Sequence, residues 1–380
     1  MSVCRACWRA AWVSVAMLTA CQRTEEGYDG VKARGHALHA VVHQVVGSVG
    51  GEKEDAFGRI SGLAVHPTGV VVATDDQVDE IIVVSAEGRV NTKIDGTPAG
   101  PGHFGSPCCI SFDREGHIWI YGRNDRRFIG FDLEGNLIGE KGQGILFIYA
   151  GRPLMFDAEG GYMIRAARPP RLIHVRADGD TLAFPTPAAP AADIVVTIVG
   201  GDGREAALAV PFATRALVAD RSDGYLARAS SARYAVEVYD EKGVLAWSVR
   251  QEHEAPELSR QQRDSALALR EAYGMAARRS GGTVTAFEIP DRNQVLERIW
   301  FDSTKRLWIQ VTTRGENRAT VADVYSEGGD FLFAAMWPDT VSLSYGAIRG
   351  SQAWGLTKGE NGIDVIVRMS FDSAREGTRR

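Results

Sequence analysis

Four pairs of glycines with a constant spacing constrain the fold of this chain more than any other feature. The pairs are Gly69 and Gly88, Gly116 and Gly135, Gly160 and Gly179, and Gly224 and Gly243, each 19 residues apart. Each pair marks two turns in a run of short apolar segments, whereas the first glycine advances by 47, 44 and 64 residues from one pair to the next. Constant spacing inside a repeat and variable spacing outside it indicate regular hairpins joined by variable loops. Four-stranded repeats of about 40 to 50 residues are typical of β-propeller blades.

Two further copies of the pattern follow. The fifth contains Ile299 and Trp308, and the sixth begins near Tyr345 and stops after a third strand at residues 363–367. The apolar segment at residues 41–46 precedes the first copy and has no partner within it. We expect it to supply the missing fourth strand, because that pairing removes exposed sheet edges. The sequence therefore predicts an all-β fold, a six-bladed β-propeller over residues 41–380 that is closed by an N-terminal strand.

Two stretches carry a resemblance to a known repeat. Residues 100–107 read Gly-Pro-Gly-His-Phe-Gly-Ser-Pro, and residues 112–120 read Phe-Asp-Arg-Glu-Gly-His-Ile-Trp-Ile. Together with Phe301-Asp302 and residues 306–309, they resemble the NHL-type repeat. The similarity covers most of residues 41–370 and is clearest in the first, second and fifth copies. It implies the propeller fold, but propellers host binding modules and enzymes alike, so it implies no single function.

Two segments interrupt the repeats. An extra hairpin is predicted at residues 194–199 and 206–210, and the strand that completes the third copy is not identified. One inserted helix is predicted at about residues 257–279, where Ser259 and Gln262 have the spacing of a capping box. Because its apolar stripe is narrow, we expect the helix to pack against the propeller and partly cover the mouth of the central channel. Packing on the outer rim is the alternative.

The N-terminus has the pattern of a targeting signal. Arg5 and Arg9 precede a short apolar run that ends in Leu-Thr-Ala-Cys at Cys21, which resembles a bacterial lipobox. The resemblance implies a signal peptide at residues 1–20, lipidation of Cys21, and a lipidated linker at residues 21–40. The alternative is an ordinary secretory signal with a chance cysteine. Gln22 in place of Asp favours the outer membrane, so we predict a lipid-anchored protein of the cell envelope, on its periplasmic or extracellular side.

Apart from the lipidated Cys21, only two cysteines remain in the expected mature chain, Cys108 and Cys109. Adjacent residues on a strand point to opposite faces, so a bond between them is not expected. We predict two small buried apolar residues, with a redox or metal site as the alternative.

The composition and motifs do not indicate chemistry. The formal net charge of -5 gives no reason to expect a nucleic-acid partner. The Gly-rich residues 47–51 precede no helical pattern, and the histidines at residues 36, 39 and 43 fit a linker that leads into a strand better than a metal site. We therefore expect no cofactor, no metal and no catalytic residue. The prediction is a monomeric binding or scaffold module.

Arginines are predicted to gather on one face of the propeller. In a four-stranded meander, the start of the first strand and the end of the second lie at the same end. The arginines that precede first strands are Arg59, Arg152 and Arg215, and those at or after the ends of second strands include Arg123, Arg165 and Arg228. A basic concavity attracts anions, so this face is expected to bind a small anionic ligand or a protein partner. The alternative is that these arginines are solvated or pair with the acids at residues 75, 76, 79 and 80.

An enzyme is the second hypothesis. A gluconolactonase-like propeller would hold a divalent metal in its channel with a set of carboxylate and amide ligands. Glu297 is the one acid at a suitable position, whereas Arg59, Ser106, Arg152 and Arg215 stand at the corresponding positions of other blades. We therefore expect Glu297 to pair with an arginine on the ligand-binding face. A propeller hydrolase or lyase with its site in the central channel remains the alternative.

Overall fold

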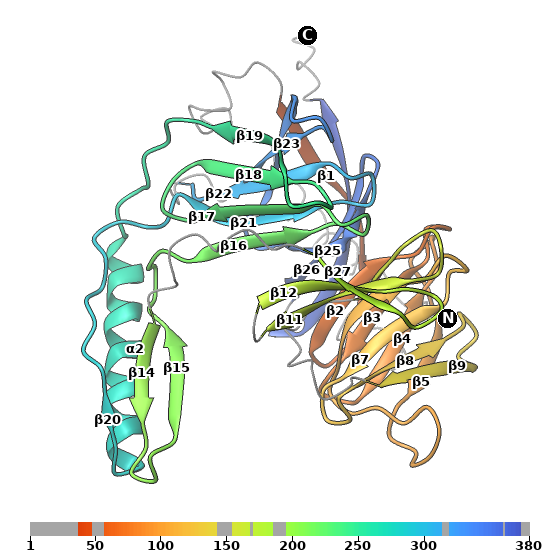
Figure 1. Ribbon diagram of the computed structural model, residues 1–380, viewed down its shortest axis with the longest axis horizontal. Helices are drawn as coiled ribbons and strands as arrows, with labels where there is room; N and C mark the ends of the chain where they lie inside the picture. The colour runs from red at the N-terminus through yellow and green to blue at the C-terminus, as the bar shows by residue number, and fades with distance from the viewer. Residues whose placement is uncertain are drawn as a thin grey trace, which may run out of the picture.

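The described chain is an all-β fold with one helix (Figure 1). The structure is a computed structural model, and it describes residues 37–47, 57–142, 154–167, 170–184, 195–313, 319–359 and 362–373. The predicted signal peptide, Cys21 and most of the predicted linker lie outside these residues. Among the described residues, no helix has the length and apolar character needed to cross a bilayer.

The first four predicted repeats each form a four-stranded antiparallel sheet. Sheet 1 consists of β2 (Ile60–Val65), β3 (Val71–Asp75), β4 (Glu80–Val84) and β5 (Val90–Asp95). Sheet 2 consists of β6 (Pro107–Phe112), β7 (Ile118–Gly122), β8 (Arg127–Phe131) and β9 (Leu137–Gly142). Sheet 3 consists of β10 (Met155–Phe156), β11 (Tyr162–Ala167), β12 (Pro170–Val175) and β13 (Thr181–Ala183), so β13 is the strand that the sequence left unidentified. Sheet 4 consists of β16 (Ala216–Asp220), β17 (Leu226–Ser230), β18 (Ala235–Tyr239) and β19 (Leu245–Arg250).

The N-terminal strand completes the last repeat. Sheet 5 consists of β21 (Leu296–Phe301), β22 (Leu307–Val311), β23 (Ala319–Tyr325) and β24 (Phe331–Pro338). Sheet 6 consists of β25 (Ser342–Arg349), β26 (Gln352–Lys358), β27 (Asp364–Ser373) and β1 (Ala37–Val46). β1 runs antiparallel to β27, from Leu38 opposite Ser373 to Val46 opposite Ile366. The predicted pairing of the N-terminal segment with the sixth repeat is therefore confirmed.

The paired glycines occupy turns that need their conformational freedom. All eight have φ between +77° and +95°, a region that side-chain-bearing residues rarely adopt. In sheet 2, the Asp113 carboxylate accepts the N–H of His117 (2.8 Å) and the indole N–H of Trp119 (2.9 Å). The Asp and Trp of the NHL-like motif are thus partners in one turn.

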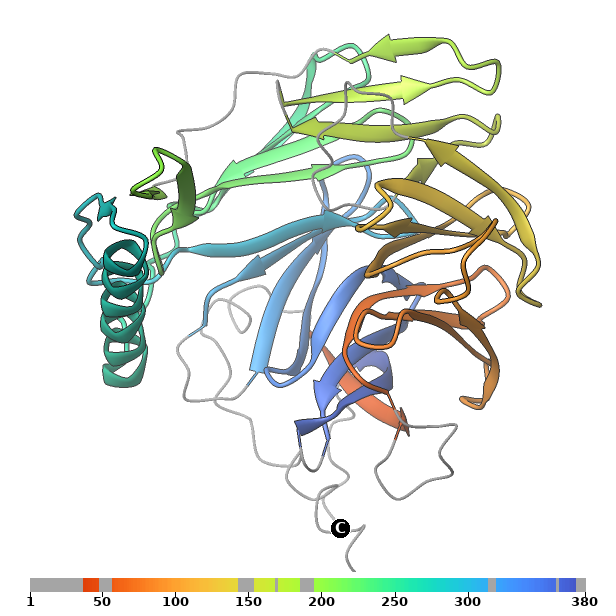
Figure 2. The ribbon, with the colours of Figure 1, turned by 90° about the horizontal axis from the view of Figure 1, so that it is seen from below.

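Neighbouring sheets pack face to face in chain order, and Figure 2 shows them following one another around the molecule. Sheets 1 and 2 share a buried cluster that includes Val72, Ile81, Ile118 and Ile129. Similar clusters join sheets 2 and 3, 4 and 5, 5 and 6, and 6 and 1. Sheets 3 and 4 meet where the ring of Phe184 lies against Gly224. First strands of neighbouring sheets also touch, since β2 contacts β6 and β25, and β16 contacts β21.

The two interruptions form one small layer beside the sheets (Figure 1). The predicted hairpin is present as β14 (Val195–Val199) and β15 (Glu205–Ala209), and β20 (Thr283–Val284) pairs with β14. The helix α2 (Arg260–Arg279) is also present, and the predicted capping box of Ser259 and Gln262 is confirmed.

The predicted packing of the helix is wrong. α2 lies on β14 and β20, where Ala266 and Ala277 are its buried residues and Tyr273 meets the ring of Phe287. Figure 1 shows this layer projecting to one side of the sheets rather than over their centre. The reason is that both insertions contribute to a local core, which contains Val196 and against which Tyr273 of the helix packs.

Candidate functional site

The predicted proximity of first-strand starts and second-strand ends is confirmed in three sheets. In sheet 1 the N–H of Asp76 donates to the carbonyl of Arg59 (3.0 Å), and in sheet 2 the N–H of Arg123 donates to the carbonyl of Ser106 (3.3 Å). In sheet 4 Ser231 donates to Arg215 in the same way (2.9 Å). These contacts bring side chains of neighbouring sheets to one end of the inner strands.

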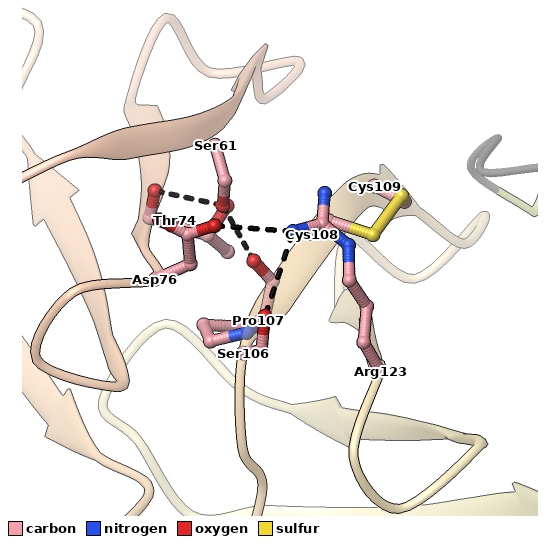
Figure 3. The surroundings of a disulfide bond; sticks show 8 residues. All are labelled: Ser61, Thr74, Asp76, Ser106, Pro107, Cys108, Cys109 and Arg123. Atoms are coloured by element: carbon pink, nitrogen blue, oxygen red, sulfur yellow. Dashed lines mark hydrogen bonds and ion pairs between the residues drawn. A yellow bond between two sulfur atoms is a disulfide. The ribbon is translucent and has the colours of Figure 1, made fainter. Parts of the chain in front are cut away.

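One carboxylate bridges two of the predicted arginines (Figure 3 shows the Arg123 side). The Nε of Arg59 donates to Oδ1 of Asp76 at 2.5 Å, and Nη1 of Arg123 donates to Oδ2 at 3.1 Å. Arg123 also reaches the hydroxyl of Ser106 at 3.5 Å. The Asp76 side chain is only 7% exposed, whereas those of Arg59 and Arg123 are 67% and 46% exposed. We refer to Arg59, Asp76, Ser106 and Arg123 as the Asp76 cluster.

The other acids of the same loop have separate partners. The Asp75 carboxylate accepts backbone N–H groups of Gly58, Arg59 and Gln77, which fixes the chain that carries Arg59. Asp79 accepts the N–H of Ser106 at 2.6 Å, and Glu80 lies 3.7 Å from the ammonium of Lys93. Among these four acids, Asp76 alone forms ion pairs with the predicted arginines whose side chains the structure describes. The hydrogen bond from Arg59 to Asp76 raises the pKa of Arg59, so the guanidinium stays charged.

Polar side chains hold the innermost strands of sheets 1 and 2 together beside this cluster (Figure 3). The Ser61 hydroxyl donates to the carbonyl of Pro107 at 2.5 Å and lies 3.0 Å from the Thr74 hydroxyl. Gly62 leaves space for the close approach of β6, since an added Cβ there would lie 3.2 Å from the nitrogen of Cys109. These contacts therefore fix the position of β2 relative to β6 beside the cluster.

The expectation of two separate cysteines is wrong. Cys108 and Cys109 form a disulfide bond within β6 (Figure 3). Cys109 has φ of +67°, and the pairing of β6 with β7 is irregular between Cys108 and Ser111. The alternation of a regular strand does not hold at such a position, so the two sulfurs can lie on the same side.

Glu297 and Arg215 are also brought together, but not as an ion pair of side chains. Nη2 of Arg215 donates to the main-chain carbonyl of Glu297 at 2.6 Å. The Glu297 carboxylate instead accepts the side-chain amide of Gln310 at 2.5 Å. Burial raises the pKa of Glu297, and this effect outweighs the hydrogen bond from Gln310 and the charge of Arg215. Its carboxylate is thus held by an amide rather than by an arginine.

The other predicted residues lie apart or outside the described residues. Arg228 pairs with Glu237 at 2.9 Å within sheet 4 and stacks over Tyr239. Arg165 lies in β11, although its side chain is outside the described set, and Arg152 and Cys21 are not described. No hydrogen bond or ion pair within the described ranges joins the Asp76 cluster to Arg215 or Glu297. Of the predicted arginines, the structure therefore joins Arg59 and Arg123 through Asp76 and describes separate contacts for Arg215 and Arg228.

One acidic and histidine group has ligand atoms close enough for a metal. Its members are Asp113, Glu115 and His117, whose candidate atoms lie within 4.8 Å of one another. Asp113 already accepts hydrogen bonds from His117 and Trp119. The group therefore serves the turn of sheet 2.

Sequence reasoning missed two features of the site. It found Arg59 and Arg123 by strand polarity but treated Asp76 only as one of four neutralising acids. It also discounted the Cys108–Cys109 bond on the assumption of regular strand geometry. The Cys-Cys sequence was itself the available signal, because two adjacent thiols need only one irregular residue to meet.

Comparisons with known proteins support the architecture and assign no activity. No family model matches the chain, and no curated protein matches it. A Bacteroides fragilis protein assigned as exported is 8% identical, with a TM-score of 0.51 over 92% of this chain and 98% of that chain. Virginiamycin B lyase from Staphylococcus aureus is 12% identical, with a TM-score of 0.43 over 87% and 99%. A protein assigned as a gluconolactonase is also 12% identical, with a TM-score of 0.40 over 88% and 93%. Likenesses at this level of identity show the fold alone.

Proposed function

We propose that this protein is a lipid-anchored, closed six-bladed β-propeller of the cell envelope, and that it binds a small anionic ligand or the anionic group of a protein partner. The pairing of β1 with β27 supports closure of the ring. The lipobox-like sequence at Cys21 supports anchoring, with the outer membrane favoured by Gln22. The disulfide of Cys108 and Cys109 fits an oxidising compartment outside the cytoplasm.

The observation that carries the binding function is the sharing of Asp76 by two arginines. One carboxylate accepts a single nitrogen of Arg59 and a single nitrogen of Arg123. Within the described chain, the Nη atoms of Arg59 and Nη2 of Arg123 have no hydrogen-bond partner. Guanidinium groups offer forked donors that suit carboxylate and phosphate oxygens. The buried Asp76 holds both groups side by side, which lowers the entropic cost of binding an anion between them.

Titration calorimetry tests this assignment. The mature protein is titrated with inorganic phosphate and with galacturonate at low and at moderate salt. We expect binding of at least one probe that weakens with salt, because both arginines are exposed and their interactions are screened. The Arg59→Ala/Arg123→Ala variant should bind that probe about tenfold more weakly or worse, since each charged hydrogen bond contributes roughly 1.5 to 3 kcal/mol.

The control is Arg204→Ala, because Arg204 is 91% exposed in the β14–β15 turn, where it lies near Asp202. This variant should bind like the parent. Failure of both probes to bind the parent, or equal binding by the double variant, would remove the Asp76 cluster as the anion site.

An enzyme is the second candidate, and one observation favours it. The Glu297 carboxylate is partly buried and accepts the side-chain amide of Gln310, and burial raises its pKa, as it does for carboxyl groups that act as general acids or bases. The gluconolactonase-like form of the hypothesis requires a divalent metal held near Glu297. Measuring the metal content of purified protein separates the two candidates, since a stoichiometric metal lost in Glu297→Gln would favour the enzyme.

A further inference from the structure

The disulfide of Cys108 and Cys109 is not placed where a cross-link would stabilise the fold. A disulfide stabilises a fold mainly by restricting the unfolded chain, and this effect grows with the length of the closed loop. Adjacent residues enclose no intervening chain, so this bond contributes little of that kind. Its place on β6, beside the Asp76 cluster, calls for another explanation.

The two sulfur-bearing residues differ in access. Cys108 is fully buried, at 0% exposure, in a cluster with Trp119, Tyr121 and Phe128. Cys109 is only partly buried and packs at the edge of the same cluster. An incoming thiolate must approach from solvent, so Cys109, the more exposed residue of the two, is the expected target.

The surrounding backbone keeps the pair together. The close approach of β2 at Gly62 confines Cys109 from one side, and Ser61 ties β2 to the carbonyl of Pro107. Ser106, two residues before Cys108, is held by Asp79 and by Arg123. Because these contacts do not involve sulfur, the strand should keep its place when the bond opens. The guanidinium of Arg123 also supplies a cation in this region, which favours a thiolate.

We propose that the Cys108–Cys109 bond is a thiol–disulfide exchange site that takes small dithiols from solvent at Cys109. A thiolate of the dithiol attacks Sγ of Cys109, and the Cys108 sulfur leaves as a thiolate that takes up a proton. The second thiol of the reductant then loses its proton and attacks the mixed disulfide, which releases Cys109 as a thiolate that is protonated in turn. Two electrons pass to the protein, and the dithiol becomes a cyclic disulfide. This site does not depend on anion binding by the Asp76 cluster.

The first experiment measures reduction of the folded protein. Native protein is treated with dithiothreitol, quenched with acid, denatured, alkylated and cleaved after Lys93 and Arg114. The peptide of residues 94–114 contains no cysteine other than Cys108 and Cys109, so its mass reports this bond alone. We expect two alkyl groups on this peptide and an unchanged circular dichroism spectrum before the quench. A peptide that stays oxidised until the dithiol is applied in denaturant would overturn the proposal.

The second experiment tests the direction of attack with a matched pair of variants. Cys108→Ser leaves the thiol of Cys109, and Cys109→Ser leaves the thiol of Cys108. With a small aromatic disulfide as the probe, the same peptide should gain the mixed disulfide about tenfold faster in Cys108→Ser, because thiol exchange follows access and thiolate character. Equal rates, or faster exchange at Cys108, would contradict the assignment of Cys109 as the entry point. If either variant fails to fold, the reduction of the parent protein still decides the proposal.

Discussion

Glu297 is the residue at which burial and ionisation conflict most directly. Its raised pKa means that the folded protein holds this proton more tightly than the unfolded chain does. The carboxyl group therefore favours folding at low pH and loses that contribution as the pH rises from its ordinary pKa of 4.5 through the raised folded value. Above that folded value the folded protein bears the cost of a partly buried charge.

We expect Glu297→Gln to remove this cost. The variant should have a higher free energy of unfolding than the parent at about pH 7, and the difference should shrink at about pH 4, where the parent carboxyl is protonated in both states. Urea unfolding at the two pH values measures it. Glu205→Gln, at an exposed position of β15, is the control and should show no such pH-dependent difference. A pH-independent effect of Glu297→Gln would mean that the residue acts through packing rather than charge.

At the scale of residues, the sequence predicted the features that depend only on the path of the backbone. The proximity of Arg59 and Arg123 followed from strand polarity, which places the start of one strand beside the end of the next. The bridge through Asp76 depends on side-chain rotamers, and the disulfide depends on the positive φ of Cys109. Neither quantity is encoded in the apolar pattern, so the sequence offered pairing with four acids as an alternative without singling out Asp76, and it did not predict the disulfide.

At the scale of elements, the spacing of glycines and of capping residues predicted the structure better than the apolar pattern did. The glycine pairs located the hairpins, and the capping box located α2. The packing of α2 was not predictable, because its partners β14 and β20 lie on opposite sides of it in the sequence and about 80 residues apart from each other. A narrow apolar stripe indicates that a helix has one buried face, but it does not identify the surface that covers this face.

The turn between β16 and β17 offers a test of the glycine rule. Gly224 has φ of +89°, and an added Cβ would lie 2.9 Å from both the Phe184 ring and the Glu241 side chain. Gly224→Ala should therefore lower the free energy of unfolding by roughly 1 to 3 kcal/mol, from backbone strain and the contact between sheets 3 and 4. Gly139→Ala, in β9, is the matched control, since Gly139 has no positive φ and no atom within 4 Å of its added Cβ. Equal stabilities of the two variants in urea unfolding would contradict this account of the repeat.

For the whole molecule, the N-terminal strand β1 joins the last sheet of the series. β1 pairs with β27 over most of its length and touches β24 through Ala37, Leu38 and His39. β25 of the same sheet meets β2 at Ala64 and Gly346. The continuous strand order through sheets 5, 6 and 1 follows from these contacts. The sequence predicted this arrangement because the last copy of the repeat lacks a strand and the first apolar segment has no partner. Pairing the two supplies what each lacks.

The proposed closure requires that the inward side chains of β1 contribute to the core between sheets 6 and 1. Val46 is 4% exposed and packs with Ile366 and Val84, whereas its neighbour Val45 is 56% exposed. Val46→Asp would bury an unpaired charge, so the free energy of unfolding should fall by about 3 kcal/mol or more. Val45→Asp places the same charge in solvent one residue away and should change it by no more than about 0.5 kcal/mol. Urea unfolding of both variants measures the difference. Similar losses in the two, or a stable Val46→Asp variant, would mean that β1 is not an integral strand of the last sheet and that the ring is held closed by other contacts.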